Sequence, residues 1–489
     1  MDIQDLLNES PSKDETTLDS ETESRLHRLT ADDVDHDQLK DTLEQLAASS
    51  RGSEALRHRL ASPTNLARLT QIITSESGKP TGSLQPALRC IGNACFEKED
   101  AANTVASLGL DWAVTILHGG DQAIIAITTS VLNNICIQSV EAQKQACKLG
   151  LDDDLLYLLT RPDEDDGFAS VPLEVVLLIA SHRKEVNREG MPSWKAHGTD
   201  FTTDVLAWAN RTDASLGVEN WACMLEITLT YLREPDMQGQ VVESKQVDMV
   251  WDLLSRNEDL ISQQGEAASS GAELDSAEVR RLLKPESMSL TWVLSDLAAH
   301  SAFVSNYELE NSWLQGVIID SLRHAPSAVG GATAVMNSHA RPNAACQVLG
   351  NLLHALPPSS AMPLVQEKAL HQPLLAAMAS TDDADFLHSA TGLLIKLARP
   401  SSDICETIAS DANLFPALEK LNAHPMQQLK QDALALMRVL GKDSPAVQER
   451  LRDIAKDVLV AAAAAQNQEA ANGGAPQALT PGSITGVVE

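Results

Sequence analysis

Two runs of carboxylates are the residues in this sequence with the clearest capacity for chemistry. Asp152, Asp153 and Asp154 precede the apolar stretch 155–159, and a second acidic run, 163–166, follows it. Paired carboxylates act as acid and base only in a dry pocket that separates their pKa values. Neighbouring proline and glycine residues indicate solvent-exposed loops instead. The sequence therefore predicts either plain solvated loops or a docking patch for Lys and Arg.

Other catalytic and ligand-binding motifs are missing from the sequence. The stretch SGKPTG at Ser77 lacks the preceding glycine of a P-loop, and Pro80 stands in place of Ser or Thr. No GxGxxG, HExxH or GxSxG motif occurs. Cys90 and Cys95 are five residues apart on one predicted helix, which is not a zinc spacing, and no second pair follows. We expect no enzymatic activity, no metal and no cofactor.

Asparagines recur within apolar helical stretches. Asn93 lies in IGNAC, Asn134 in LNNIC and Asn351 in VLGNLL. At about 100° per residue, Asn93 points away from the apolar stripe of residues 84–95. An asparagine can bond backbone nearby or contact a ligand, and both readings stay open. These three residues, together with Asn103, are candidates for contact with a partner.

The asparagines belong to a repeat of about 41 residues. LGLD at 108–111 returns at 149–152, and IGNAC at 91–95 returns as LNNIC at 132–136, both at an offset of 41. This period lies in the range of armadillo and HEAT repeats. The fold class predicted is all-α: an armadillo/HEAT-type α-solenoid, a right-handed superhelix of three-helix repeats, with about eight or nine repeats.

Composition divides the 489 residues into three parts. Residues 1–35 are acidic and polar and are expected to be largely disordered. Residues 36–465 are expected to form the solenoid, with a polar insertion at about 255–278, and 466–489 a flexible tail. The low aromatic content, 3%, within 43% hydrophobic residues favours packed helices over sheets.

The charge balance limits the partners. The net charge is −31, from 68 acids and 37 bases, which argues against nucleic acid and favours a basic protein partner. No apolar run reaches the roughly 18 residues that span a bilayer, so direct membrane insertion is not expected. Seven cysteines are scattered along the chain, and five of them lie in apolar helical patterns, which fits buried thiols in a reducing compartment. We expect a cytoplasmic or nucleocytoplasmic protein.

The stretch LRCIGNACFEKEDAANTVASLGL, residues 88–110, resembles the repeat of the small-GTPase GDP-dissociation stimulator family (smgGDS). The family has a GN-x-C step, an acidic spacer, Asn-Arg-x-x-Val and a following glycine. The matching residues are Gly92, Asn93, Cys95, Glu97, Asn103 and Gly109. Thr104 stands where the family has Arg. The next unit keeps three of these positions, as Asn134, Cys136 and Gly150.

The resemblance implies a non-catalytic binding protein for Ras/Rho-type GTPases that carry a basic, prenylated C-terminal tail. Such a protein stimulates guanine-nucleotide exchange, acts as a chaperone of the GTPase, or does both. The main alternative is a scaffold or chaperone cofactor that binds another basic client with the same solenoid. An importin-type adaptor is less favoured, because the residues four before Asn93, Asn134 and Asn351 are not tryptophan.

Overall fold

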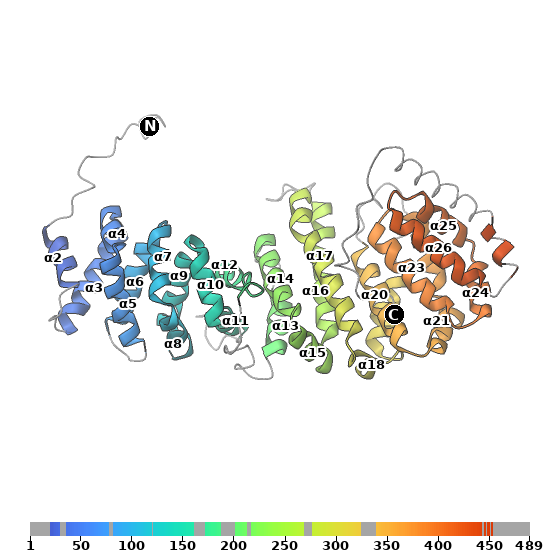
Figure 1. Cartoon of the computed structure of the whole chain (residues 1–489), viewed down its shortest axis with the longest axis horizontal. Helices are drawn as coiled ribbons and strands as arrows, with labels where there is room; N and C mark the ends of the chain where they lie inside the picture. Colours follow the sequence, from blue (N-terminus) through green and yellow to red (C-terminus); the bar gives the residue numbers. More distant parts are fainter. Residues whose placement is uncertain are drawn as a thin grey trace, which may run out of the picture. The chain divides into compact units, whose positions relative to one another are not determined.

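The structure is a computed structural model that describes residues 20–29, 36–77, 82–119, 121–160, 172–186, 201–212, 217–267, 276–323, 339–442, 445, 447–449 and 451–452. Within these residues the regular structure is helical throughout, with no β-strand (Figure 1). The all-α prediction is therefore confirmed. The chain forms two compact units: unit 1 comprises 1–241 and 277–286, and unit 2 comprises 242–276 and 287–489.

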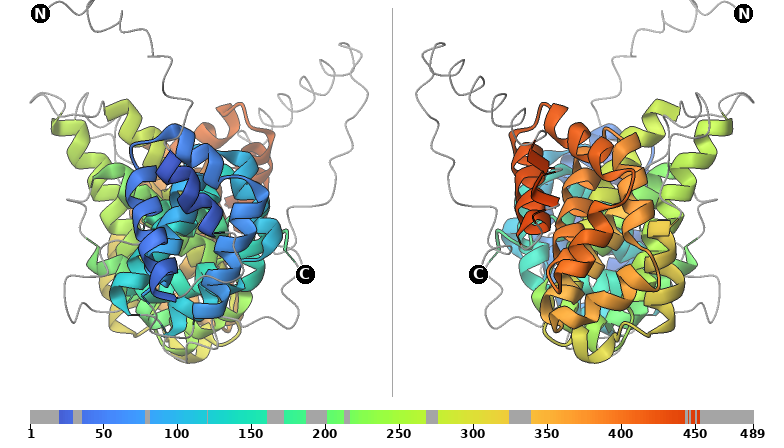
Figure 2. Two further views of the ribbon diagram at one scale, coloured as in Figure 1. Left: turned by 90° about the vertical axis from the view of Figure 1, so that its left-hand side faces the viewer. Right: turned by 90° about the vertical axis from the view of Figure 1, so that its right-hand side faces the viewer.

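Unit 1 begins with short helices that follow one another closely along the chain, and the first of them, in blue, lie towards the viewer in the left view of Figure 2. Their bounds are α2 (Ser20–Leu29), α3 (His36–Ser50), α4 (Glu54–Leu60), α5 (Pro63–Glu76), α6 (Leu84–Cys95), α7 (Glu99–Leu108), α8 (Asp111–Gly119), α9 (Gln122–Gln138), α10 (Val140–Leu149), α11 (Leu151–Thr160), α12 (Leu173–Ala180), α13 (Phe201–Arg211), α14 (Val218–Leu232) and α15 (Pro235–Glu243), the last ending in unit 2.

Helices of unit 1 pack in rows. α3 packs against α6, α6 against α9, α9 against α12, and α12 against α14. A second row is formed by α7 and α10, and a third by α8 and α11. Between α3 and α12, each helix in a row is therefore three helices further along the chain than the one before it. This is the packing expected of a helical repeat protein, in which each unit buries its apolar stripe against the next.

The apolar stripe of α6 shows why the rows form. Leu84, Ala87, Leu88, Ile91 and Cys95 are all buried, as the helical angle predicted. Each large side chain of this kind contributes about 1.5–3 kcal/mol when it leaves water. A charge at the centre of this stripe would lose that contribution and be left without a partner.

The repeated LGLD sequences form equivalent corners. Gly109 follows α7 with φ 105°, and Gly150 follows α10 with φ 77°. Positive φ favours glycine, because a Cβ would clash with the backbone. The chain then re-enters a helix at once, α8 after the first corner and α11 after the second. The ψ angles differ, 145° at Gly109 and 19° at Gly150, so the 41-residue repeat in sequence is a repeat in the order of helices and in the position of a positive-φ glycine.

Unit 2 contains the remaining helices, with α24 to α26 towards the viewer in the right view of Figure 2. They are α16 (Val247–Ala267), α17 (Ser276–Ala299), α18 (Phe303–Asn306), the π-helix η3 (Leu314–Ile318), α19 (Ile319–Arg323), α20 (Ala340–Ala355), the 3-10 helix η6 (Pro358–Ala361), α21 (Met362–Gln366), α22 (His371–Ser380), α23 (Ala384–Ala398), α24 (Ser402–Ala409), α25 (Leu414–Ala423) and α26 (Gln427–Gly441). The first part of α17, 277–286, is counted with unit 1.

Rows of helices recur within unit 2. α20 packs against α23 and α23 against α26, while α19, α22 and α25 form a parallel row.

Two expected segment assignments differ from the structure. Ser20–Leu29, placed in a largely disordered segment, is the helix α2, and its Leu26 and Leu29 are buried. The expected polar insertion at 255–278 is mostly the second half of α16, where Asn257 and Glu258 are buried. Asn257 Nδ2 donates to Ser287 Oγ of α17 at 2.8 Å, so these polar side chains satisfy one another rather than water. The predicted tail 466–489 lies outside the described residues.

Candidate functional site

The recurrent asparagines join neighbouring helices of a row. Asn93 Nδ2 of α6 donates to Ala47 O and Ser50 Oγ of α3, at 3.2 and 2.8 Å. Asn134 Nδ2 of α9 donates to Gly92 O of α6 at 3.1 Å. Each amide therefore takes part in the packing between neighbouring helices of the row, whereas the sequence predicted that it faces away from the packed side.

The same contact occurs in unit 2. Asn351 Nδ2 of α20 donates to Ser295 O and Oγ of α17, at 2.9 and 3.2 Å. Lys396 Nζ of α23 then donates to Gly350 O of α20 at 2.8 Å, so a lysine takes the place of the amide one helix later. Burial lowers the pKa of Lys396, with Arg399 adding to the effect.

Asn103 occupies a different position. Its side-chain oxygen on α7 accepts a hydrogen bond from Ser139 Oγ at 2.5 Å. Ser139 is the N-cap of α10, and its hydroxyl oxygen also accepts from the Ala142 N–H at 3.0 Å. Asn103 therefore fixes the start of α10 against α7. The four candidate asparagines each form a hydrogen bond that joins two helices.

The expectation that Asp152, Asp153 and Asp154 lie in solvated loops is wrong. They form the first turn of α11 and are only 0%, 1% and 7% exposed. The corner at Gly150 starts α11 directly, so the carboxylates enter the helix amino end, where negative charge is favoured by the helix dipole. A buried carboxylate cannot serve as a docking patch. The second acidic run, 163–166, lies outside the described residues.

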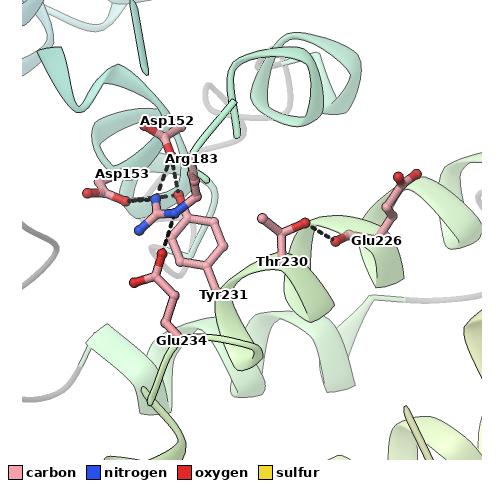
Figure 3. Close-up of polar contacts among 7 residues, drawn as sticks. All are labelled: Asp152, Asp153, Arg183, Glu226, Thr230, Tyr231 and Glu234. Carbon is pink, nitrogen blue, oxygen red and sulfur yellow. Dashed lines mark hydrogen bonds and ion pairs between the residues drawn. The ribbon is translucent and has the colours of Figure 1, made fainter. Parts of the chain in front are cut away.

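Arg183 is the partner that permits this burial (Figure 3). Its Nη1 donates to Asp152 Oδ2 at 2.5 Å and to Asp153 Oδ1 at 2.6 Å. Its Nε donates to Glu234 Oε1 at 2.6 Å. The guanidinium thus joins α11, the turn after α12 and the turn after α14, all within unit 1.

Tyr231 of α14 completes the cluster. Its hydroxyl lies 3.2 Å from Asp152 Oδ2 and 3.0 Å from Asp153 Oδ1, and its ring centroid lies 4.2 Å from the Arg183 guanidinium carbon. Burial by itself lowers the pKa of Arg183, but Tyr231, Asp152 and Asp153 outweigh it and the net direction is upward. Arg183 therefore stays charged. We call the five residues Asp152, Asp153, Arg183, Tyr231 and Glu234 the Arg183 clamp.

Asp154 has a separate partner. Its Oδ1 lies 2.8 Å from His118 Nε2 at the end of α8, and the His118 side chain is about half exposed. The contact links α8 to α11, the row that the fold places side by side. All three carboxylates therefore serve the packing of unit 1.

The sequence carries little signal for the clamp. Arg183 lies among other charged residues after α12, and Tyr231 is 79 residues from Asp152. One clue was available: three consecutive acids directly after the Gly150 corner must sit in a helical turn, where successive side chains face different ways. At least one of them would then face the helical packing.

No arrangement for metal or thiol chemistry appears in the part of the chain that the structure describes. There, no group of His, Cys, Asp and Glu side chains is placed to hold a metal ion. Cys90, Cys95 and Cys136 are buried, which raises the pKa of each thiol to about 12. Such thiols stay protonated and act as small apolar side chains. No described helix is long and apolar enough to cross a membrane.

Comparisons with known proteins assign no family. No protein-family model matches the chain, and no curated protein matches it. Two similar solved structures are both engineered proteins. The first is 15% identical, with 90% of this chain and 94% of that chain covered and a TM-score of 0.47. The second is 14% identical, with 56% and 98% covered and a TM-score of 0.36. At these scores we draw nothing from them.

Proposed function

We propose that the chain is a non-catalytic binding protein for a small Ras/Rho-type GTPase with a basic, prenylated C-terminal tail. It acts as an exchange stimulator or chaperone of that GTPase. We further propose that its helix rows are armadillo-type repeats, about eight or nine in number, in a right-handed superhelix. The resemblance at residues 88–110 suggests the client class.

The observation that carries the proposal is the acidic charge that the helix rows leave at the surface. The chain has a net charge of −31. In unit 1, acids in the first turns of successive helices are exposed, namely Glu99, Asp100, Asp111 and Glu141. Negative charge at helix amino ends also offsets the helix dipole, so these acids are compatible with folding as well as with binding.

An acidic surface of this kind favours a cationic client by long-range attraction. Steering of this sort raises association rates by about 10- to 1000-fold at low salt. At physiological salt its reach shortens to about 8 Å, so close contacts must supply the rest of the affinity. Nucleotide exchange follows if the protein prefers the nucleotide-free GTPase, because a ligand shifts an equilibrium only by its differential affinity.

The asparagines are not the principal client contacts in this proposal. Asn93 and Asn134 already donate to the preceding helix of their row, and Asn351 donates to Ser295 of α17. Asp152, Asp153 and Asp154 are buried in unit 1. The client instead meets exposed acids and exposed apolar side chains, and no covalent chemistry by this chain is required.

The test is a binding assay with one GTPase prepared in three forms: prenylated with its basic tail, unprenylated with the tail, and lacking the tail. The full chain is titrated against each form by calorimetry at low salt, and nucleotide release is followed with a fluorescent GDP analogue. We expect both tailed forms to bind and the tail-less form to bind at least tenfold more weakly. If none of the forms binds at low salt, the proposal is wrong.

A further inference from the structure

Exposed apolar side chains recur at one position of the row formed by α6 and α9. Phe96, directly after α6, is 47% exposed, and Ile137, at the end of α9, is 43% exposed. Their offset of 41 residues is the repeat period. Val140, at the start of α10, is 57% exposed. Because large exposed apolar side chains that gather in one place mark interaction surfaces, this recurrence is informative.

These residues lie close together within unit 1. α6 packs against α9, and α7 packs against both α9 and α10. Asn134, near the end of α9, donates to Gly92 O, near the end of α6. The carboxyl-terminal turns of the two helices, beside Phe96 and Ile137, therefore pack against each other. The Ser139 to Asn103 bond brings the start of α10 against α7. Asn103 lies in the middle of α7, so the start of α10 packs beside the body of α7. The α6–α7 turn and the α9–α10 turn are therefore equivalent turns of neighbouring repeats, and we call them together a corner.

Acids are interleaved with these apolar residues. Glu97 follows Phe96, Glu99 begins α7, and Glu141 follows Val140, all three exposed. We call this set the corner surface: Phe96, Glu97, Glu99, Ile137, Val140 and Glu141. A second copy of this chain is a poor occupant, since it would bring another net charge of −31 towards the same acids.

Glu97 has an unusual backbone conformation that can be used in the test. Its φ is 55°, in the left-handed region, where a residue with a Cβ is disfavoured by about 1–2 kcal/mol. Glycine would relieve that strain, yet a glutamate stands there, directly beside the exposed Phe96. Lys245 and Ala369 also have positive φ, so it is the exposed carboxylate of Glu97 beside Phe96, and not the strain, that points to binding.

We propose that the corner surface is the docking site for a basic peptide segment in which Lys or Arg alternates with apolar side chains. The apolar side chains of the segment cover Phe96, Ile137 and Val140, and its cations pair with Glu97, Glu99 and Glu141. This inference rests on the proposed function, because it assigns the basic tail of the client to one surface. It requires no client for its test.

The test uses a fluorescein-labelled synthetic peptide of lysines interspersed with leucine and phenylalanine, titrated with the full chain and followed by anisotropy. We expect the double variant Phe96→Ser/Ile137→Ser to weaken binding roughly tenfold, with unchanged salt dependence. Met426→Ser is the matched control, because Met426 is 48% exposed and lies in unit 2. It should leave the affinity unchanged.

Two further arms separate charge from apolar contact. A lysine–serine peptide should bind the wild-type chain about as weakly as the apolar peptide binds Phe96→Ser/Ile137→Ser. Glu97→Gly should weaken binding of the apolar peptide severalfold while its melting temperature stays equal or rises, since glycine relieves the strain. Glu97→Gly also covers the case in which the double variant fails to fold.

The inference is overturned if the double variant or Glu97→Gly binds the apolar peptide as tightly as wild type. It is also overturned if the lysine–serine peptide binds wild type equally well, because the apolar side chains would then contribute nothing. Failure of the proposed function is read separately, in the GTPase titrations. A chain that binds the tailed GTPase but shows no effect of the corner variants would keep the function and lose this docking site.

Discussion

Two regions of unit 1 join their helices by different means. In the row α3–α6–α9, single amides from Asn93 and Asn134 donate to backbone and hydroxyl oxygens of the preceding helix. Among α11, α12 and α14, the Arg183 clamp gathers several charges in the interior. The first region follows the 41-residue period closely, and the second does not.

This contrast indicates how a repeat protein tolerates irregular units. Where the repeat is regular, apolar stacking already fixes the geometry, and one amide bond per step adds about 1 kcal/mol. Where helices change in length and spacing, a buried ion cluster restricts the allowed arrangements, since a misplaced charge would be left without a partner. The clamp therefore stabilises this region mainly because any rearrangement that separates Arg183 from the carboxylates would leave charges buried and uncompensated.

Removal of Arg183 should have the largest effect. Arg183→Ala leaves Asp152 and Asp153 buried without their cation, and we expect it to lower the free energy of unfolding by about 3–5 kcal/mol. The loss of stability is measured by denaturant unfolding monitored with circular dichroism. Arg438→Ala, at an exposed residue of unit 2, is the control. A loss below about 1 kcal/mol would show that the clamp is dispensable.

Truncation of the amides should have a smaller effect that differs between the two positions. Asn93→Ala removes a donor to two acceptors and should lower stability by about 1–2 kcal/mol, and Asn134→Ala, with one acceptor, by about 1 kcal/mol. The same unfolding assay ranks them. If both variants were as stable as wild type but no longer bound the client, the amides would contact the partner and would not stabilise the fold.

Glu286 should produce the smallest effect, visible only as a pH dependence. Its pKa is raised to about 7, first by burial and second by Glu226, with Arg233 opposing. A raised carboxyl pKa means that the folded state favours the protonated form, so this stabilisation is present below the ordinary value and lost as the pH rises through 7.

Glu286→Gln should therefore raise stability relative to wild type at pH 8 and not at pH 4. The gain should be roughly 1 kcal/mol after allowance for partial solvent screening. Melting temperatures of the two proteins across pH 4 to 8 would reveal it. Parallel curves throughout the range would contradict the assignment.

The regular corners could be predicted from sequence because their cause is local. Gly109 and Gly150 need positive φ, and the stripe of α6 needs only a helical period. The clamp could not be predicted in this way. Arg183 and Tyr231 reach the Asp152 carboxylate from 31 and 79 residues away, and no local pattern selects them among other charged or aromatic residues.

The segment 255–278 shows how far composition reaches. Its polar residues predict an insertion between repeats, whereas Asn257 and Glu258 lie within α16 and bond to Ser287 of α17. Polar composition predicts exposure only when no complementary polar group lies on the neighbouring helix.

The most direct test of the account is the rate at which the full chain associates with a GTPase that keeps its basic tail, measured by stopped flow over a salt series. A binding surface set by the net charge of −31 predicts a rate that falls at least tenfold from low to physiological salt. It also predicts that deletion of the tail abolishes this dependence. An association rate that is the same at every salt concentration, or no association at low salt, would contradict the account.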